Sequence, residues 1–220
     1  MIRHHPDSDL LLEYAAGALT PAPTVSITAH LHFCKRCQAA VEAMGEVGGG
    51  MLEQQQPADV SDSLLDKVLL CIADDAPAET KPVPVRKFND ELINKLPAYV
   101  RGLLPGQELP WRKLTAGLRV AQIDVGEDEC ELALHRIDAG GKTPNHDHLG
   151  REITVVLTGS FSDEDGVYQP GDYLVREPGE KHTPFAARNE ACICLSVLEA
   201  PIKLTGMKRV LNPFLRFSPS

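Results

Sequence analysis

One stretch of eight residues, 30–37, constrains the fold of this chain more than any other. It contains His30, Cys34 and Cys37 in an H-x3-C-x2-C arrangement. Residues four apart on a helix project from the same face, so His30 and Cys34 would lie one turn apart. The two-residue gap between the cysteines lets one turn present two thiolates to one metal ion. The spacing therefore predicts three ligands of a metal site.

A tetrahedral zinc site needs a fourth ligand, and the nearest candidates upstream are His4 and His5. Spacing alone does not choose between them. A closed site with two cysteines and two histidines is structural, because no position is left for a substrate. The alternative is a pair of reduced core cysteines beside a surface histidine, although apolar packing does not require this spacing. Lys35 and Arg36 should favour the thiolate form of the cysteines.

The first 75 residues have the apolar spacing of helices. Each helix should be amphipathic, and so short a segment can form only a small core, which a metal ion would stabilise. The expected boundaries are an N-cap at 7–9, a break at 21–23, a second helix from Thr24, a third from Cys37 to the glycines at 48–50, and a fourth capped by Ser61.

The fourth predicted helix has a broad apolar face after a glycine-rich break. Two interpretations are open for it. The face could pack on the other three helices in a four-helix domain, or it could bind the surface of a partner protein. Its residues are Leu64, Leu65, Val68, Leu69 and Ile72.

Charge is uneven along the chain. The net charge is −9, and residues 1–75 carry four basic and eleven acidic side chains. Such a segment is not expected to bind nucleic acid directly, but it could pair with a basic protein surface or simply aid solubility. With no apolar run long enough for a membrane and no signal-peptide core, the expected location is the cytoplasm. There, six cysteines are metal ligands or free thiols rather than disulfides.

The pattern changes after residue 75. Prolines and charges at 76–96 predict a linker, and from 97 to 220 the apolar period becomes two, which is typical of strands. Short strands separated by glycine- and proline-rich turns indicate an all-β jelly-roll barrel. The predicted domains are thus 1–75, 76–96 and 97–220. The predicted strands are 118–125, 130–137, 152–161, 172–176 and 191–199.

A second constellation lies in the β half, where His146, His148 and Glu152 form an H-x-H-x3-E array and His182 follows a turn. Residues two apart on a strand share a face, so both imidazoles can point into a barrel. The array resembles the two-motif pattern of the cupins. This donor set suits zinc, iron or manganese, and surface histidines are the alternative interpretation.

Cys192 and Cys194 alternate on one predicted strand and therefore share a face. They are either small buried side chains or a thiol pair that oxidises as part of a signal.

Together, the two motifs resemble the ChrR-type zinc anti-sigma factors across essentially the whole chain. The likeness includes Arg3-His4-His5, the segment 14–17, His182-Thr183-Pro184 and Cys192-Ile193-Cys194. It implies zinc on the first ligand set, with His5 as the fourth ligand, and a second zinc in the cupin, where iron or manganese remain alternatives. The implied ligands are His5, His30, Cys34 and Cys37 for the first site, and His146, His148, Glu152 and His182 for the second.

The resemblance also implies a function. The N-terminal domain would bind and inhibit an extracytoplasmic-function-type sigma factor, and the cupin would be needed for its release in an oxidative stress response to singlet oxygen. The chain would then have no catalytic residues. The rival hypothesis is a metal-dependent cupin dioxygenase or isomerase with an appended structural zinc module. A third is a zinc-stabilised adaptor without a sigma partner.

Overall fold

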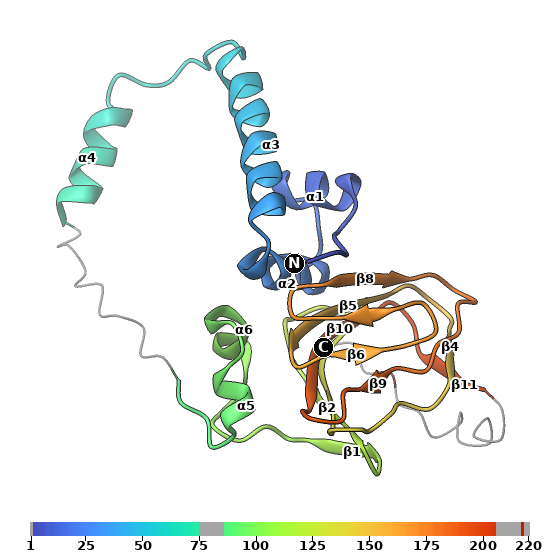
Figure 1. Ribbon diagram of the computed structural model, residues 1–220. Coiled ribbons are helices and arrows are strands. Elements are labelled where there is room, and N and C mark those ends of the chain that lie inside the picture. Colours follow the sequence, from blue (N-terminus) through green and yellow to red (C-terminus); the bar gives the residue numbers. More distant parts are fainter. Residues whose placement is uncertain (1, 75–85, 206–216, 218–220) are drawn as a thin grey trace.

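The computed structural model describes residues 2–74, 86–205 and 217, and it has helices in its N-terminal part and a β-barrel in its C-terminal part (Figure 1). None of the helices in these residues combines the length and apolarity that a membrane span requires. The helices are α1 Ser8–Ala15, α2 Pro21–Phe33, α3 Lys35–Glu53, α4 Leu64–Asp74, α5 Glu91–Asn94 and α6 Ala98–Leu103.

Two helix boundaries differ from those predicted by the sequence. The Asp7 side chain caps α1 by accepting from the Leu10 amide, as expected. However, α2 begins at Pro21 rather than after Pro23, because proline has a helical φ and its missing N–H is not needed in the first turn. Helix α3 also runs through Gly48–Gly50 to Glu53, since glycine lowers helix stability without forcing an end.

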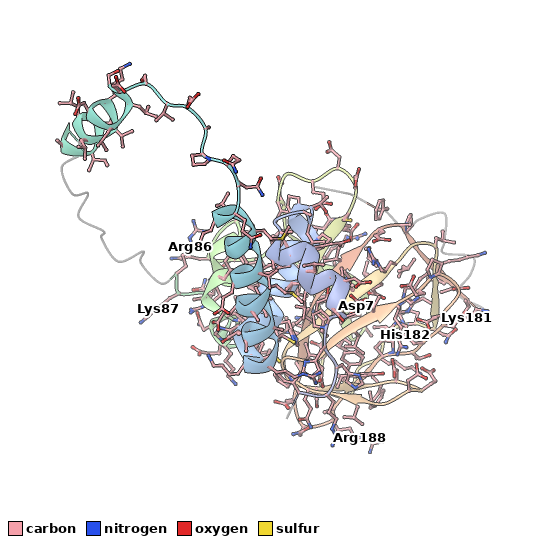
Figure 2. The ribbon with its side chains drawn as sticks, turned by 90° about the horizontal axis from the view of Figure 1, so that it is seen from above. Asp7, Arg86, Lys87, Lys181, His182 and Arg188 are labelled. Carbon is pink, nitrogen blue, oxygen red and sulfur yellow. The ribbon has the colours of Figure 1, made fainter. Side chains whose placement is uncertain are left out.

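Helix α4 does not join the other N-terminal helices. It stands apart from α1–α3 and from the barrel in both views (Figures 1 and 2), and its described side chains are exposed. Of the two interpretations of this helix, packing on the other three helices is therefore not found in this structure. Helices α1, α2 and α3 contact one another and form the bundle by themselves.

The barrel consists of three antiparallel sheets. The largest has the order β1-β2-β3-β10-β5-β8, and the others are β11-β4 and β7-β6-β9. Each of the five segments predicted as strands contains one. The strands are β1 Arg112–Thr115, β2 Leu118–Gln122, β3 Glu131–Ile137, β4 His146–His148, β5 Glu152–Thr158, β6 Phe161–Ser162, β7 Val167–Tyr168, β8 Tyr173–Arg176, β9 Phe185–Ala186, β10 Cys192–Leu198 and β11 Ile202–Leu204.

Alternation along β10 explains how the helices and the barrel meet. Cys192 and Cys194 point into the barrel core, whereas Ile193 and Leu195 belong to a second core on the other face of the sheet. That second core also contains apolar residues of α1 and α2, such as Ile27. The N-terminal helices are therefore packed on the barrel across a shared hydrophobic core.

Part of the predicted linker is packed rather than extended. Residues 75–85 lie outside the described residues, but Phe88, Ile93 and Leu96 are buried in the core shared with the barrel. Asp90 also forms an ion pair with Arg136 of β3. The chain from residue 86 onward thus packs with the barrel, because its apolar side chains have the sheet face to cover.

Candidate metal centres

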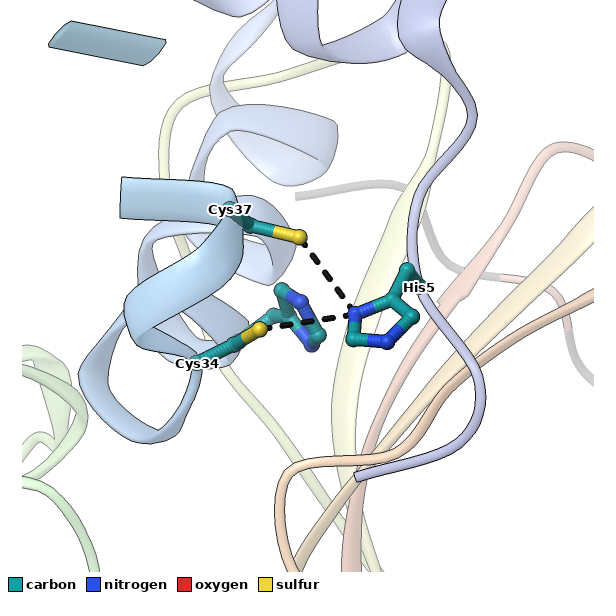
Figure 3. A group of neighbouring side chains, drawn as sticks. His5, Cys34 and Cys37 are labelled. Carbon is teal, nitrogen blue, oxygen red and sulfur yellow. Dashed lines mark hydrogen bonds between the residues drawn. The ribbon is translucent and has the colours of Figure 1, made fainter. Parts of the chain in front are cut away.

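The N-terminal cluster forms where three separate segments meet. His5 comes from the chain before α1, His30 from the last turn of α2, and Cys34 and Cys37 from the junction of α2 and α3. Their potential ligand atoms all lie within 4.8 Å of one another. The Nδ1 atom of His5 is 3.4 Å from each of the two sulfur atoms (Figure 3). The side chains that the spacing predicted to meet are therefore brought together.

His4, the other candidate for the fourth position, is not part of this cluster. Its ring packs edge-on against Tyr168, with the ring centroids 5.0 Å apart. Neighbouring residues of an extended chain point in opposite directions, so only one of the two histidines can face the cysteines. The fold turns His5 toward them.

Burial governs the protonation of this cluster. His30 is fully buried, and burial lowers the pKa of its imidazole to about 4, so the ring is neutral at neutral pH. Burial, together with a hydrogen bond to Cys34, raises the pKa of the Cys37 thiol to about 11. The charge of Arg36 acts in the opposite direction but is a smaller effect, so the expected thiolate does not form on its own. A metal ion would have to displace the thiol protons.

The donor set fits a zinc ion. Two sulfurs and two imidazoles at mutual distances of a few ångströms match a closed tetrahedral site. The Nε2 atom of His30 is buried without a hydrogen-bond partner in the described part of the chain, which is the state of a ring nitrogen that awaits a ligand. The cluster therefore fits zinc binding in the N-terminal region.

The second cluster lies inside the barrel. Its four side chains come from β4, from the start of β5 and from the turn before β9, and all four are buried. The Nε2 atom of His148 is 2.6 Å from the Glu152 carboxylate, and the Nε2 atoms of His146 and His182 are 3.0 Å apart. Because these residues share one interior, the predicted surface-histidine alternative does not describe them.

Each imidazole of the barrel cluster is held by its other nitrogen. The Nδ1 atom of His146 bonds to the Pro144 carbonyl, and that of His148 to the Glu180 carbonyl. The Nδ1 atom of His182 lies 3.2 Å from the Asp163 carboxylate. Such outer bonds fix the ring orientation and leave Nε2 facing inward.

Charges inside the barrel cluster compensate one another. Burial opposes ionisation of Glu152, but hydrogen bonds from the three histidines hold the pKa of its carboxyl well below the usual range. Burial would also lower the pKa of His182, yet its bonds to Asp163 and Glu152 raise it to about 9. Three imidazoles and one carboxylate suit zinc, iron or manganese.

A cavity of about 90 Å³ adjoins the barrel cluster. His146, Glu152 and His182 form part of its wall, and most of the remaining lining is apolar. Cys194 also lines this cavity, with its sulfur 3.6 Å from that of Cys192. The hydrogen bond to Cys192 and burial raise the pKa of the Cys194 thiol well above its usual range, so Cys194 is held in the protonated form.

Two parts of these sites were recognised in the sequence only as turns and not as parts of a site. One is Asp163, which supports His182 from an acidic turn that looks like an ordinary loop. The other is the turn between β7 and β8, which contacts the N-terminal cluster through Gly171. Spacing does not indicate either role, because each residue acts through the folded position of its turn.

Comparison with known proteins extends these observations over the whole chain. A family model described as the ChrR Cupin-like domain matches residues 101–200. The anti-sigma-E factor ChrR of Cereibacter sphaeroides is 34% identical over 216 residues, which cover 98% of this chain and 99% of the relative. The crystal structure of Rhodobacter sphaeroides SigE in complex with the anti-sigma ChrR matches with a TM-score of 0.74 and 32% identity, covering 90% of this chain and 100% of that chain.

Proposed function

The chain belongs to the ChrR family of anti-sigma factors, and from that premise we propose that it binds and inhibits an extracytoplasmic-function-type sigma factor. One observation carries the proposal: the similarity to an anti-sigma factor extends over nearly the full length of both chains, helices and barrel included. A match to the barrel alone would support only a cupin.

Helix α4 supports the proposal, since it offers an unpartnered apolar surface. Leu65 and Ile72 are 66% and 62% exposed, although apolar side chains of this size are normally buried. An amphipathic helix of this kind suits a hydrophobic groove on another protein. We assign the contact with the sigma factor to Leu64, Leu65, Val68, Leu69 and Ile72.

The metal sites have different roles in this proposal. His5, His30, Cys34 and Cys37 would bind a structural zinc ion that orders the α2–α3 junction. His146, His148, Glu152 and His182 would bind a second metal, zinc in preference to iron or manganese. The second metal would be needed for release of the sigma factor under oxidative stress. In this proposal the protein acts in the cytoplasm and has no catalytic residue.

The domain boundaries of the proposal follow composition and packing. Residues 1–75 form the anti-sigma part, 76–96 connect it to the barrel, and 97–220 form the cupin. Phe88, Ile93 and Leu96 are buried, so a truncated chain that contains the cupin should also keep these residues of the linker.

The experiment is co-expression with extracytoplasmic-function-type sigma factors, followed by co-purification and transcription assays with core polymerase. We expect a stable one-to-one complex with one of them and loss of its transcription. Failure of every such sigma factor to co-purify would contradict the proposal. His146→Ala should retain the complex but respond less to singlet oxygen, and an unchanged response would remove the cupin metal from the mechanism.

Oxygen uptake and metal analysis of the purified chain test the enzymatic alternative. An anti-sigma role predicts no substrate-dependent oxygen consumption. Turnover with iron or manganese bound beside the cavity would favour a dioxygenase instead.

A further inference from the structure

The turn between β7 and β8 of the barrel contacts the N-terminal cluster directly. The carbonyl oxygen of Gly171 lies 2.7 Å from the Nδ1 atom of the fully buried His30. A carbonyl oxygen only accepts, so Nδ1 carries the proton and donates it, which leaves the lone pair on Nε2. The barrel thereby sets the tautomer in which His30 can bind a metal ion.

The next residue of this turn holds the segment that carries His5. The Oδ1 atom of Asp172 accepts from the backbone amides of Arg3 and His4, at 2.8 and 3.1 Å. The amide of Tyr173 donates to the carbonyl oxygen of His4 at 3.1 Å. His4 is therefore bound on both its N–H and its C=O groups, directly before the candidate ligand.

Packing leaves this turn no room to move toward the helices. Gly171 has a φ of +94°, and a Cβ atom there would lie 2.7 Å from the Cδ1 atom of Ile2 and from the Cβ atom of Phe33. Ile2 precedes His5, and Phe33 directly precedes Cys34. One turn of the barrel thus touches the chain beside three of the four ligands.

The other end of the same turn is joined to the barrel cluster. The hydroxyl group of Tyr168 donates to Oδ1 of Asp163 at 2.9 Å, and Oδ2 of Asp163 lies 3.2 Å from Nδ1 of His182. On its ring face Tyr168 contacts His4. Residues 168–173 therefore lie between the two clusters.

We propose that Gly171, Asp172 and Tyr173 are positioning residues of the N-terminal metal site, supplied by the cupin, and that they set how slowly the metal leaves it. They hold His30 and the segment of His5 in the geometry of bound ligands. Without them His5, which lies on the segment before α1, moves away more often and the metal dissociates faster. The inference rests on the proposed metal site and not on sigma binding.

The test uses the full chain loaded with Co²⁺, whose charge-transfer absorption from thiolate sulfur reports the N-terminal site alone, because the barrel cluster has no cysteine ligand. After addition of excess EDTA, the decay of this absorption gives the rate of metal loss. We expect Asp172→Ala to lose the metal about 10- to 100-fold faster than the unmodified chain, the usual effect of removing an outer-shell partner.

Two comparison variants separate positioning from general destabilisation. Asp124→Ala removes an exposed carboxylate from another barrel turn, where it accepts from the Gly126 amide, and it should keep the original rate. Asp172→Asn retains an oxygen toward Arg3 and His4 and should give an intermediate rate. If Asp172→Ala does not fold, Asp172→Asn against Asp124→Ala becomes the deciding comparison.

The inference is wrong if Asp172→Asn and folded Asp172→Ala lose the metal at the same rate as Asp124→Ala. That outcome would leave the metal site itself intact. Absence of the thiolate absorption in the unmodified chain would refute the metal site and the inference with it. Faster metal loss in both Asp172 variants, with Asp172→Ala faster than Asp172→Asn, would support the positioning role.

Discussion

The two clusters each contain four donor residues, but the fold holds them in different ways. In the barrel, His146, His148 and Glu152 lie on strands of one interior, and the side chains bond to one another before any metal is considered. In the N-terminal part, His5 and the cysteines come from a loop and a helix junction, and part of their support comes from the barrel. The barrel cluster is preorganised by its fold, whereas the N-terminal one depends on its surroundings.

This contrast teaches how metal binding and folding are linked in each region. The Glu152 carboxylate compensates positive charge in the barrel cluster, so that cluster is stable as an array of hydrogen bonds. The N-terminal cluster has no carboxylate, and burial raises the pKa of the Cys37 thiol to about 11, so this thiol keeps its proton until a metal binds. The free energy of metal binding to this cluster would therefore contribute to the folding of the helices, as in small zinc domains.

The largest effect should follow from losing the N-terminal metal. Cys37→Ser should remove most order from α1–α3 and abolish sigma binding, because a structural zinc site contributes roughly 10–16 kcal/mol of apparent binding free energy. Far-UV circular dichroism measures the loss of helical order, and co-purification measures the loss of sigma binding. Cys71→Ser, at an exposed cysteine outside the cluster, should leave the helical signal of α1–α3 unchanged. A fully helical, sigma-binding Cys37→Ser variant would remove the contrast between the two regions.

A smaller effect is expected in the barrel. Glu152→Gln removes the charge from a buried array of three histidines and should destabilise the metal-free cupin by about 3–5 kcal/mol, as for other broken buried ion pairs. Thermal unfolding measures the change, with Glu190→Gln at an exposed position as the control. The cobalt–thiolate absorption of the N-terminal site should survive. Its loss would show that the two clusters are not separately held.

Helix α4 should affect binding without affecting either cluster. Leu65→Asp should weaken sigma binding by at least about 2 kcal/mol if this face is a hot spot. Leu70→Asp is the matched control, because Leu70 is 68% exposed on the same helix but lies outside the predicted face. Titration calorimetry compares the two variants. Equal losses would show that the predicted face is wrong.

The smallest effect concerns how the helices are attached to the barrel. The Oε2 atom of buried Glu127 accepts from the Ala22 amide in the first turn of α2, at 2.6 Å. Glu127→Gln keeps an acceptor but removes the charge at the helix N-terminus, so the chain should lose about 0.5–1 kcal/mol of stability. Chemical denaturation measures it, and exposed Glu129→Gln should have no effect. A larger loss from Glu129→Gln would contradict this attachment.

Local spacing was enough to predict His30, Cys34 and Cys37 of one cluster, His146, His148 and Glu152 of the other, and five of the barrel strands. The intervals between His30, Cys34 and Cys37 place their side chains on neighbouring turns, whatever the rest of the fold. The alternation around residues 146–148 and 192–194 likewise places side chains on one face of a strand. Such patterns are reliable because they depend on the repeat of a single element.

Predictions of helix boundaries and of contacts between distant segments were less successful. Gly48–Gly50 did not end α3, and Pro21 began a helix instead of breaking one. The fourth helix has an ideal amphipathic pattern but no partner among α1–α3. Periodicity identifies which face is apolar and does not say what covers it.

By itself, therefore, the sequence determined most of the donors, namely His30, Cys34 and Cys37 in one cluster and His146, His148 and Glu152 in the other, because these follow from residue intervals along one stretch of chain. Only the tertiary structure decided that His5 rather than His4 faces the cysteines, and that a barrel turn at Gly171 bonds to His30. The physical reason is that these contacts join separate segments of the chain, 141 positions apart for His30 and Gly171, and their geometry is set by how α1 and α2 pack on the barrel sheet.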